Sequence, residues 1–100
     1  METTIYHITG KEEWQIAVIQ GFYEAASLTT EGFMHCCTAK QVDGVLQRYF
    51  AGKKDLIKLS IDINKLQPVL QYDFSPSGNE MFPHIYGRLN LEAVIATEEI

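Results

Sequence analysis

The chain has 100 residues, of which 46% are hydrophobic and 21% charged, and its formal net charge is −5. This length suits one domain, residues 1–100, built around a single core. Its few lysines and arginines are scattered, which argues against nucleic acid as a partner because nucleic-acid-binding proteins normally present a basic face. No apolar stretch approaches the ~20 residues of a membrane span, and the chain opens without a signal-peptide pattern. We therefore expect a cytoplasmic protein with no membrane partner.

The first third of the chain predicts a strand, a helix and a second strand. Residues 3–8 are rich in β-branched and aromatic side chains, which favour a strand. Residues 9–12 match a capping box with Thr9 as N-cap, so a helix should follow and end at Gly21. Its buried face should carry Trp14, Ala17 and Val18. A short extended piece (22–25), a polar loop (27–31) and a strand (32–37) are expected next.

The middle of the chain predicts a second helix and the clearest strand. Residues 38–41 match another capping box, and an apolar stripe at helical spacing follows, formed by Val42, Val45, Leu46, Tyr49 and Phe50. Gly52 should end this helix in a left-handed conformation. Residues 56–63 alternate between apolar and polar side chains, as in a half-buried strand.

The last third predicts strands joined by turns. Residues 69–74 should form a strand, followed by a loop at 75–79 rich in Ser, Pro, Gly and Asn. We expect this loop to be mobile and to border a cleft. Pro83 should place the strand at 81–86 on a sheet edge or at a bulge, and residues 91–97 should form the final strand. The predicted class is α+β, mostly antiparallel, with two helices in the N-terminal half.

All three histidines, His7, His35 and His84, lie in short runs of aromatic and apolar residues. This placement predicts that they gather around one cleft, with His7 and His35 on neighbouring strands. Strand periodicity puts Thr9 on the same face as His7, and Phe33 on the face of His35. Imidazole and hydroxyl groups beside aromatic rings suit a ribose or a planar heterocycle. The alternative is that each histidine is a core residue hydrogen-bonded to the backbone.

Other common sites lack their sequence signatures. The histidines and a carboxylate such as Glu80 have no metal-ligand spacing, so we expect no metal. No nucleophile elbow and no glycine-rich phosphate loop is present, which argues against a serine hydrolase and a mononucleotide kinase. Cys36 and Cys37 are adjacent, a poor geometry for a disulfide, and are expected to be buried thiols. A reactive thiol at Cys36 is the alternative.

Several runs of the chain, in order, resemble the bacterial domain-of-unknown-function family 952. They are Ile5–Thr9, Ser27–Leu28, Glu31–Cys36, Gly52 with Asp55-Leu56, Phe82–Gly87 and Leu89-Asn90. The resemblance covers nearly the whole chain. The chain departs from the family's usual pattern at Cys37, where a small hydroxyl residue is common, and at Arg88, where proline is common.

The family's fold is similar to that of ADP-ribosyltransferases, and this similarity implies a site. Residues 6–9 resemble the Tyr-His-Gly-Thr strand of that superfamily and of RNA 2′-phosphotransferases, in which the histidine contacts the ribose of NAD. Ile8 replaces the glycine. The superfamily's late-strand glutamate has Glu80 as its nearest counterpart and Glu31 as the second.

The resemblance therefore leaves two hypotheses. One is an enzyme that transfers an ADP-ribosyl or phospho-ribosyl group, with NAD or a related ribonucleotide as substrate and Glu80 or Glu31 as the catalytic carboxylate. The other is a binding module that keeps the fold and holds a nucleotide-like small molecule without catalysis. In both, the expected ligand-binding residues are His7, Thr9, Ser27, Phe33, His35, His84 and Tyr86.

Overall fold

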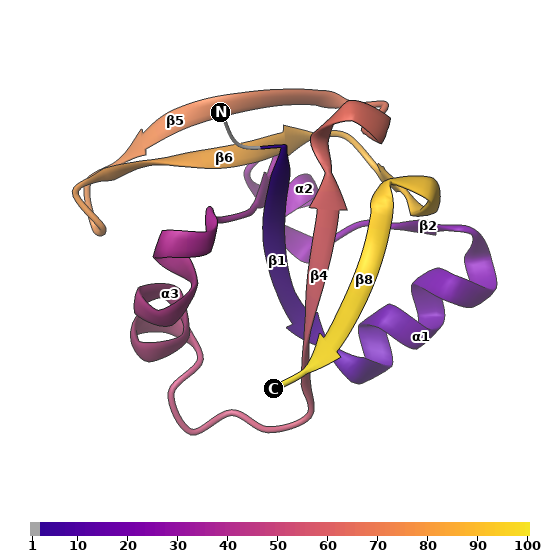
Figure 1. The fold of residues 1–100 in the computed structure, drawn as a ribbon, viewed down its shortest axis with the longest axis horizontal. Helices are drawn as coiled ribbons and strands as arrows, with labels where there is room; N and C mark the ends of the chain where they lie inside the picture. The colour runs from indigo at the N-terminus through magenta and orange to yellow at the C-terminus, as the bar shows by residue number, and fades with distance from the viewer. Residues whose placement is uncertain (1–2) are drawn as a thin grey trace.

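The computed structural model describes residues 3–100, which form three small antiparallel sheets with helices packed around them (Figure 1). Met1 and Glu2, with which the predicted domain begins, lie outside the described residues. The predicted α+β class with mostly antiparallel strands is confirmed, since the strand ladders within 3–100 are all antiparallel. None of the helices in this range is long and apolar enough to cross a membrane.

The first sheet consists of β1 (Thr4–Gly10), β4 (Leu56–Asp62) and β8 (Val94–Glu99), with β4 in the middle. The alternation expected at 56–63 is confirmed over β4, where Leu59 and Ile61 are fully buried and their polar neighbours are half-exposed. The last strand begins later than predicted, because residues Leu91–Ala93 form a 3-10 turn before β8.

The helix α1 (Lys11–Gln20) follows β1 without a break. Its predicted N-cap is wrong: β1 continues through Gly10, which becomes the N-cap, and the Thr9 side chain is instead hydrogen-bonded to the Tyr23 hydroxyl at 2.9 Å. The predicted end is confirmed, since Gly21 has φ 95° and its N–H donates to the carbonyl of Ala17.

The buried face of α1 was predicted in part. Ala17 is buried and Trp14 packs against the core, but Val18 is 55% exposed. Ile16 and Ile19 are exposed as well, so the apolar positions of α1 do not form a single stripe.

The second sheet pairs β2 (Phe22–Tyr23) with β7 (Leu89–Asn90). Between this sheet and the next strand, the segment predicted as a polar loop contains a short helix, α2 (Ala26–Thr30). The predicted strand at 32–37 is reduced to β3 (Met34–His35), followed by a single bridge between Cys37 and Tyr6 of β1.

The third sheet has the order β3-β6-β5, with β5 spanning Val69–Ser75 and β6 spanning Glu80–Tyr86. The expectation that Pro83 places its strand at an edge is wrong, because β6 is the central strand. The Pro83 carbonyl accepts from Cys36 N–H at 3.0 Å, so the position of its missing N–H also faces the β3 side. Since β3 pairs over only two residues, the ladder ends there and the missing donor is tolerated.

The second predicted helix is α3 (Val42–Tyr49), which is preceded by a 3-10 turn at Ala39–Gln41. The predicted capping box is confirmed: Gln41 Oε1 accepts from the N–H of Thr38 at 3.0 Å. Gly52 has the expected left-handed conformation, with φ 78°, but it lies in the turn after the helix rather than at its end. A further 3-10 turn, Ile63–Lys65, follows β4.

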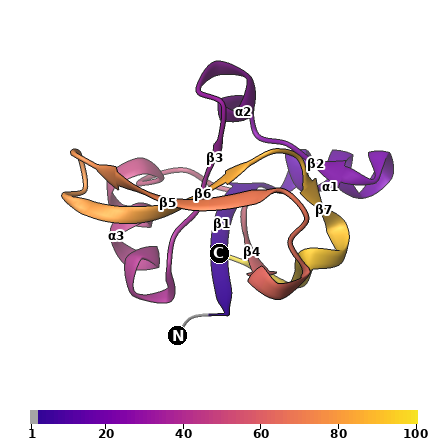
Figure 2. The ribbon, with the colours of Figure 1, turned by 90° about the horizontal axis from the view of Figure 1, so that it is seen from above.

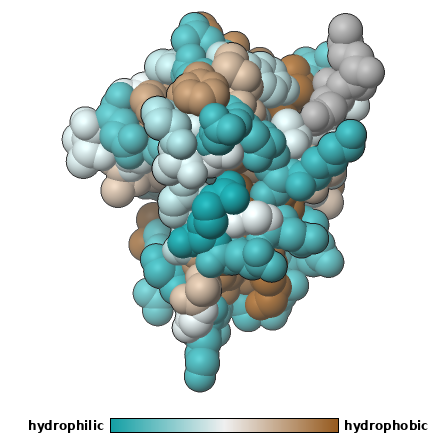
Figure 3. Space-filling model, turned by 90° about the vertical axis from the view of Figure 1, so that its left-hand side faces the viewer, coloured by the Kyte–Doolittle hydropathy of each residue, from teal (hydrophilic) through white to brown (hydrophobic). Residues whose placement is uncertain are grey.

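The hairpin of β5 and β6 lies across one end of the first sheet, and α3 lies beneath the outer part of this hairpin (Figure 1). Seen from above, α2 projects on the opposite side of the hairpin from the first sheet's strands (Figure 2). The outer face on the α3 side is mainly hydrophilic, with apolar side chains scattered over it (Figure 3). One core joins the three sheets, because Ile5 and Leu59 of the first, Tyr23 and Leu89 of the second, and Met34 and Ile85 of the third belong to one buried cluster.

Candidate functional site

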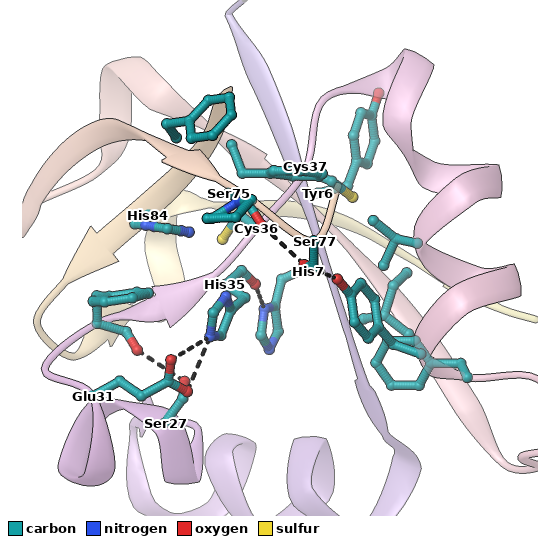
Figure 4. A pocket seen from close by; sticks show the side chains of 18 residues that line it. Tyr6, His7, Ser27, Glu31, His35, Cys36, Cys37, Ser75, Ser77 and His84 are labelled. Carbon is teal, nitrogen blue, oxygen red and sulfur yellow. Dashed lines mark hydrogen bonds and ion pairs between the residues drawn. The ribbon is translucent and has the colours of Figure 1, made fainter. Parts of the chain in front are cut away.

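A cavity of about 620 Å³ lies between β1, the segment from α2 to β3, the helix α3 and the β5–β6 hairpin (Figure 4). Its volume is within the usual range for small-molecule sites. Half of the residues that line it are aromatic or aliphatic: Tyr6, Ile8, Phe33, Val45, Tyr49, Phe50, Phe74, Pro76 and Phe82. Its polar lining consists of His7, His35, His84, Glu31, Ser27, Ser75, Ser77 and the two cysteines.

The structure brings the three histidines together, as their sequence contexts predicted. His7 of β1 and His35 of β3 lie side by side in Figure 4, and His84 of β6 lies edge-on to His35 with ring centroids 5.1 Å apart. The strands of His7 and His35 belong to different sheets, which meet at the Tyr6–Cys37 bridge. The roles of these histidines as ligand-binding residues stay a prediction.

His7 uses both ring nitrogens inside the protein. Nδ1 lies 2.6 Å from the carbonyl oxygen of His35, and Nε2 lies 2.8 Å from the hydroxyl of Tyr23. Burial lowers the pKa of His7 from 6.5 to about 4, against the smaller opposing effect of the His35 carbonyl. His7 is therefore a neutral imidazole at pH 7. It matches the alternative of a core histidine bonded to the backbone, and its nitrogens are not available to a ribose.

The neutral state of His7 fixes the direction of the hydrogen bonds among His7, Tyr23 and Thr9. A carbonyl only accepts, so Nδ1 carries the ring proton and Nε2 must accept from Tyr23. The Tyr23 hydroxyl donates its proton to this bond, so its oxygen accepts a hydrogen bond from the Thr9 hydroxyl, 2.9 Å away. Donation from Tyr23 to Thr9, the opposite direction, requires a protonated His7. Burial also raises the pKa of Tyr23 to about 12, so Tyr23 keeps its proton.

His35 and Glu31 form the exposed side of the cavity. His35 Nε2 lies 3.1 Å from Glu31 Oε2, and about half of each side chain is accessible to solvent. Ser27 belongs to α2, the short helix that ends just before Glu31. Its hydroxyl donates to the Phe33 carbonyl at 2.8 Å and so stabilises the turn that positions Phe33. Figure 4 shows Glu31 and Ser27 on one side of His35, with His7 on the other.

His84 is held from two sides by neighbouring groups. Its Nδ1 lies 2.8 Å from Asp73 Oδ2, and its ring is stacked on Phe33 with centroids 4.1 Å apart and an interplanar angle of 19°. Asp73 also accepts from Gln71 and from the Tyr86 hydroxyl. These donors lower the pKa of Asp73 to about 2, with the largest effect from Gln71. The same carboxylate raises the pKa of Tyr86.

Three of the predicted site residues do not line this cavity. Glu80 lies at the start of β6, where Gln41 Nε2 donates to it at 3.2 Å, and this nearest counterpart of the superfamily's glutamate is not among the lining residues. Tyr86 contacts Asp73 and Phe33 outside the cavity. Thr9 lies in a second, more open depression of about 890 Å³, which His7 and Ile8 also line. Glu31 is the predicted catalytic carboxylate that does reach the cavity.

The loop at 75–79 borders the cavity, as predicted. Ser75, Pro76 and Ser77 line it, and the Ser77 hydroxyl is 2.7 Å from that of Tyr49 on α3. This contact joins α3 to the β5–β6 hairpin at the rim of the cavity. Gly78 fits the turn because a Cβ there would lie 2.8 Å from a ring carbon of Phe82. The mobility expected of this loop stays a prediction.

Neither cysteine is poised to react. Both are free and buried, as the sequence predicted. Burial raises the pKa of Cys36 far above its usual range and that of Cys37 to about 11, so both stay protonated near neutral pH. A protonated thiol is a poor nucleophile and a poor metal ligand. Within residues 3–100, no cluster of three or more His, Cys, Asp or Glu side chains is arranged to hold a metal ion.

Sequence reasoning missed two residues that organise the site. Tyr23 was expected only in a short extended piece, yet it connects His7 to Thr9. Asp73 was expected only as a residue of a strand, yet it orients His84. A cross-strand search could have found Asp73, because a hairpin with the turn at 75–79 places it diagonally opposite His84.

The structure is similar to the crystal structure of protein CC0527 from Caulobacter crescentus, with a TM-score of 0.86 and 30% identity over 96% of this chain and 84% of that one. A double mutant of CC0527 gives a TM-score of 0.86 at 29% identity, with the same coverage. Its solution NMR structure gives 0.82 at 28% identity, over 99% of this chain and 85% of that one.

No curated protein matches the chain. The model of the family described as "Protein of unknown function (DUF952)" matches residues 8–97. This match covers His35, His84 and most of the cavity lining, and it begins one residue after His7, so the chain belongs to the DUF952 family.

Proposed function

We propose that this protein binds a small planar molecule of the nucleoside or nucleotide type in the 620 Å³ cavity. The observation that carries the proposal is the lining itself, in which rings from four parts of the chain surround a few polar groups. Ligand sites in proteins typically have this composition, with apolar walls and a few polar groups that fix orientation. The resemblance to ADP-ribosyltransferases supports the same class of ligand.

A second candidate is ribosyl transfer from NAD or a related ribonucleotide. Glu31 favours it, because this carboxylate lines the cavity beside His35 and could stabilise a positively charged ribosyl group. Two observations weigh against it. Glu80 does not line the cavity and is bonded to Gln41, and His7 has no free nitrogen for a ribose. Binding without catalysis is therefore the function that the geometry supports best.

A thermal-shift measurement tests the binding proposal. The purified protein is screened with the four ribonucleosides, their 5′-monophosphates, NAD and ADP-ribose. A ligand at 100 times its dissociation constant stabilises a protein by about 2.7 kcal/mol, which is readily measured as a rise in melting temperature. If none of these compounds changes the melting temperature, the proposal is wrong.

An assay of nicotinamide release separates the two candidates. We expect no release of nicotinamide when the protein is incubated with NAD. Release that disappears in Glu31→Gln, while a matched surface variant such as Glu92→Gln retains it, would establish the enzyme and replace the binding module. Glu92 is a suitable control because it lies in a turn before β8 and is not part of the cavity.

A further inference from the structure

The cavity offers no uncompensated positive charge. None of its lining residues is a lysine or an arginine. His7 is neutral at pH 7, His35 is paired with Glu31, and His84 is paired with Asp73. Any positive charge that a phosphate group could meet among the lining residues is therefore already paired with a carboxylate.

Three cations, Lys58, Arg48 and Lys53, lie against aromatic rings of the cavity, but none of them is a lining residue. Lys58 Nζ lies 5.2 Å from the Tyr6 ring centroid, but it is paired with Glu98 at 2.9 Å. The guanidinium of Arg48 lies over the Tyr49 ring and near Gly78 of the 75–79 loop, and Lys53 Nζ lies 5.4 Å from the Phe50 ring centroid; both are outside the cavity wall. Phosphate sites normally use arginine forks, lysines or helix N-termini. Among the described residues, no lysine or arginine lines the cavity wall, and the one helix that contributes a first-turn residue to it, Ser27 of α2, has only five residues.

In its neutral form, His84 presents one hydrogen-bond acceptor whose identity the Asp73 contact fixes. The Asp73 carboxylate only accepts, so the Nδ1 of His84 carries the ring proton. In the neutral imidazole, Nε2 is then an acceptor. No group within residues 3–100 bonds to this atom, and every fully buried side-chain nitrogen or oxygen in that range has a partner. Nε2 is therefore accessible, and since His84 is only 5% exposed and lines the cavity, it is accessible from there.

The ring of His84 is also fixed in orientation. Phe33 stacks on one of its faces at 4.1 Å, and His35 meets it edge-on at 5.1 Å. With Asp73 holding Nδ1, the ring can neither rotate nor exchange its tautomer without losing contacts. A preorganised acceptor costs little conformational entropy when a ligand binds.

We propose that the cavity selects an uncharged planar nitrogen heterocycle, such as a nucleoside or its base, whose N–H donates to His84 Nε2, and that Asp73 is the positioning residue for this contact. This inference rests on the proposed function and narrows it. The ligand lies against the aromatic wall, its N–H meets the acceptor, and a 5′-phosphate is disfavoured because the cavity provides no cation to replace its water.

Matched pairs of ligands test the inference on the unchanged protein. Affinities are measured by calorimetry for each ribonucleoside and its 5′-monophosphate. They are also measured for uridine against 3-methyluridine and adenosine against N6,N6-dimethyladenosine, in which methyl groups replace the donated protons. We expect the monophosphates to bind about tenfold or more weakly than the nucleosides, and the methylated member of the better-binding pair to lose about tenfold, the loss of one buried hydrogen bond.

Two variants test the residues. His84→Phe keeps an aromatic ring for Phe33 to stack on but removes the acceptor, and about tenfold weaker nucleoside binding is expected. Asp73→Asn can donate to Nδ1 and so move the ring proton to Nε2, which turns the acceptor into a donor. The imidazole ¹⁵N spectrum should show this change of tautomer, together with a similar loss of affinity. Asp43→Asn, the same substitution at an exposed position of α3, should change neither.

The outcomes are distinct for the two proposals. If no nucleoside or nucleotide binds, the proposed function itself is wrong. If nucleotides bind as tightly as nucleosides or more tightly, the function stands and the selection of uncharged ligands is wrong. Equal binding of methylated and unmethylated ligands overturns the role of His84. If Asp73→Asn shifts the tautomer of His84 but leaves the affinity for the nucleoside unchanged, the role of His84 is overturned as well.

Discussion

A buried histidine without a charged partner is stable only as neutral imidazole, and His7 reaches this state through the His35 carbonyl and the Tyr23 hydroxyl. Its pKa is 6.5 when unfolded and about 4 when folded, so the unfolded chain takes up the proton first on acidification. The free energy of unfolding is therefore at its full value above pH 6.5 and falls as the pH drops toward 4. The total loss is about 3 kcal/mol.

We predict that His7→Gln removes this pH dependence. The variant should be less stable at pH 7, because its amide replaces the imidazole imperfectly. Between pH 6.5 and 4.5, however, its free energy of unfolding should change much less than that of the parent protein. Urea unfolding at a series of pH values measures both curves. An equal slope in the two proteins would show that His7 is not the titrating group. His35 is the titratable neighbour that contacts His7 most directly, and it is present in both.

Tyr23 carries a hydroxyl that two buried groups share. Tyr23→Phe leaves His7 Nε2 without a donor and Thr9 Oγ1 without a partner, while the ring packing is retained. We expect a loss of about 1–3 kcal/mol in the free energy of unfolding, because buried polar groups are left unsatisfied.

Tyr86→Phe is the matched control for this change. It also removes one tyrosine hydroxyl, but Tyr86 is partly exposed and Asp73 keeps its bonds to Gln71 and His84. Its cost should be below about 1 kcal/mol in chemical denaturation. A cost for Tyr23→Phe no larger than that of Tyr86→Phe would contradict the buried chain of hydrogen bonds.

At the scale of elements, Gln41 joins the start of α3 to the start of β6. Its side chain accepts from the Thr38 N–H and donates to the carbonyl of Met81 at 2.8 Å and to Glu80. We predict that Gln41→Ala lowers the free energy of unfolding by about 1–3 kcal/mol, as both a cap and a buried cross-link are lost. Gln47→Ala, at an exposed position of α3, should change it by less than about 0.5 kcal/mol in the same measurement.

Elements with a local cause could be predicted from the sequence. The alternation along β4, the glycine that ends α1 and the capping box before α3 each depend on neighbouring residues, and each was confirmed. The Thr9 capping box failed because Tyr23, far from it along the chain, binds the threonine hydroxyl. Pro83 was predicted to mark a sheet edge or a bulge. The prediction of an edge failed because a central proline is tolerated beside the short strand β3, and the length of β3 is a tertiary property.

The features of the candidate site likewise divide into those that local sequence could predict and those that it could not. Aromatic runs around the histidines were sufficient to predict that His7, His35 and His84 converge, because strand segments with such side chains are usually half-buried. Which nitrogen of each ring is free could not be predicted. This depends on Tyr23 and Asp73, which come from strands whose register no local pattern specifies.

At the scale of the whole molecule, the three sheets share one core, and we predict that they unfold together. Ile85 belongs to the third sheet and is fully buried in the cluster that also contains Tyr23 of the second. Trp14 is the single tryptophan and lies 6.4 Å from the Tyr23 ring, so its fluorescence reports on the region around α1 and the second sheet.

Ile85→Ala should therefore shift the urea midpoint of Trp14 fluorescence as far as that of far-UV circular dichroism. We expect a loss of about 2–5 kcal/mol in both signals, because the cavity left in a shared core destabilises every element that contacts it. Ile95→Ala, at a half-exposed position of β8, serves as the control and should change both by under about 1 kcal/mol. If Ile85→Ala lowers the dichroism midpoint and leaves the Trp14 midpoint in place, the β3-β6-β5 sheet unfolds separately from the rest.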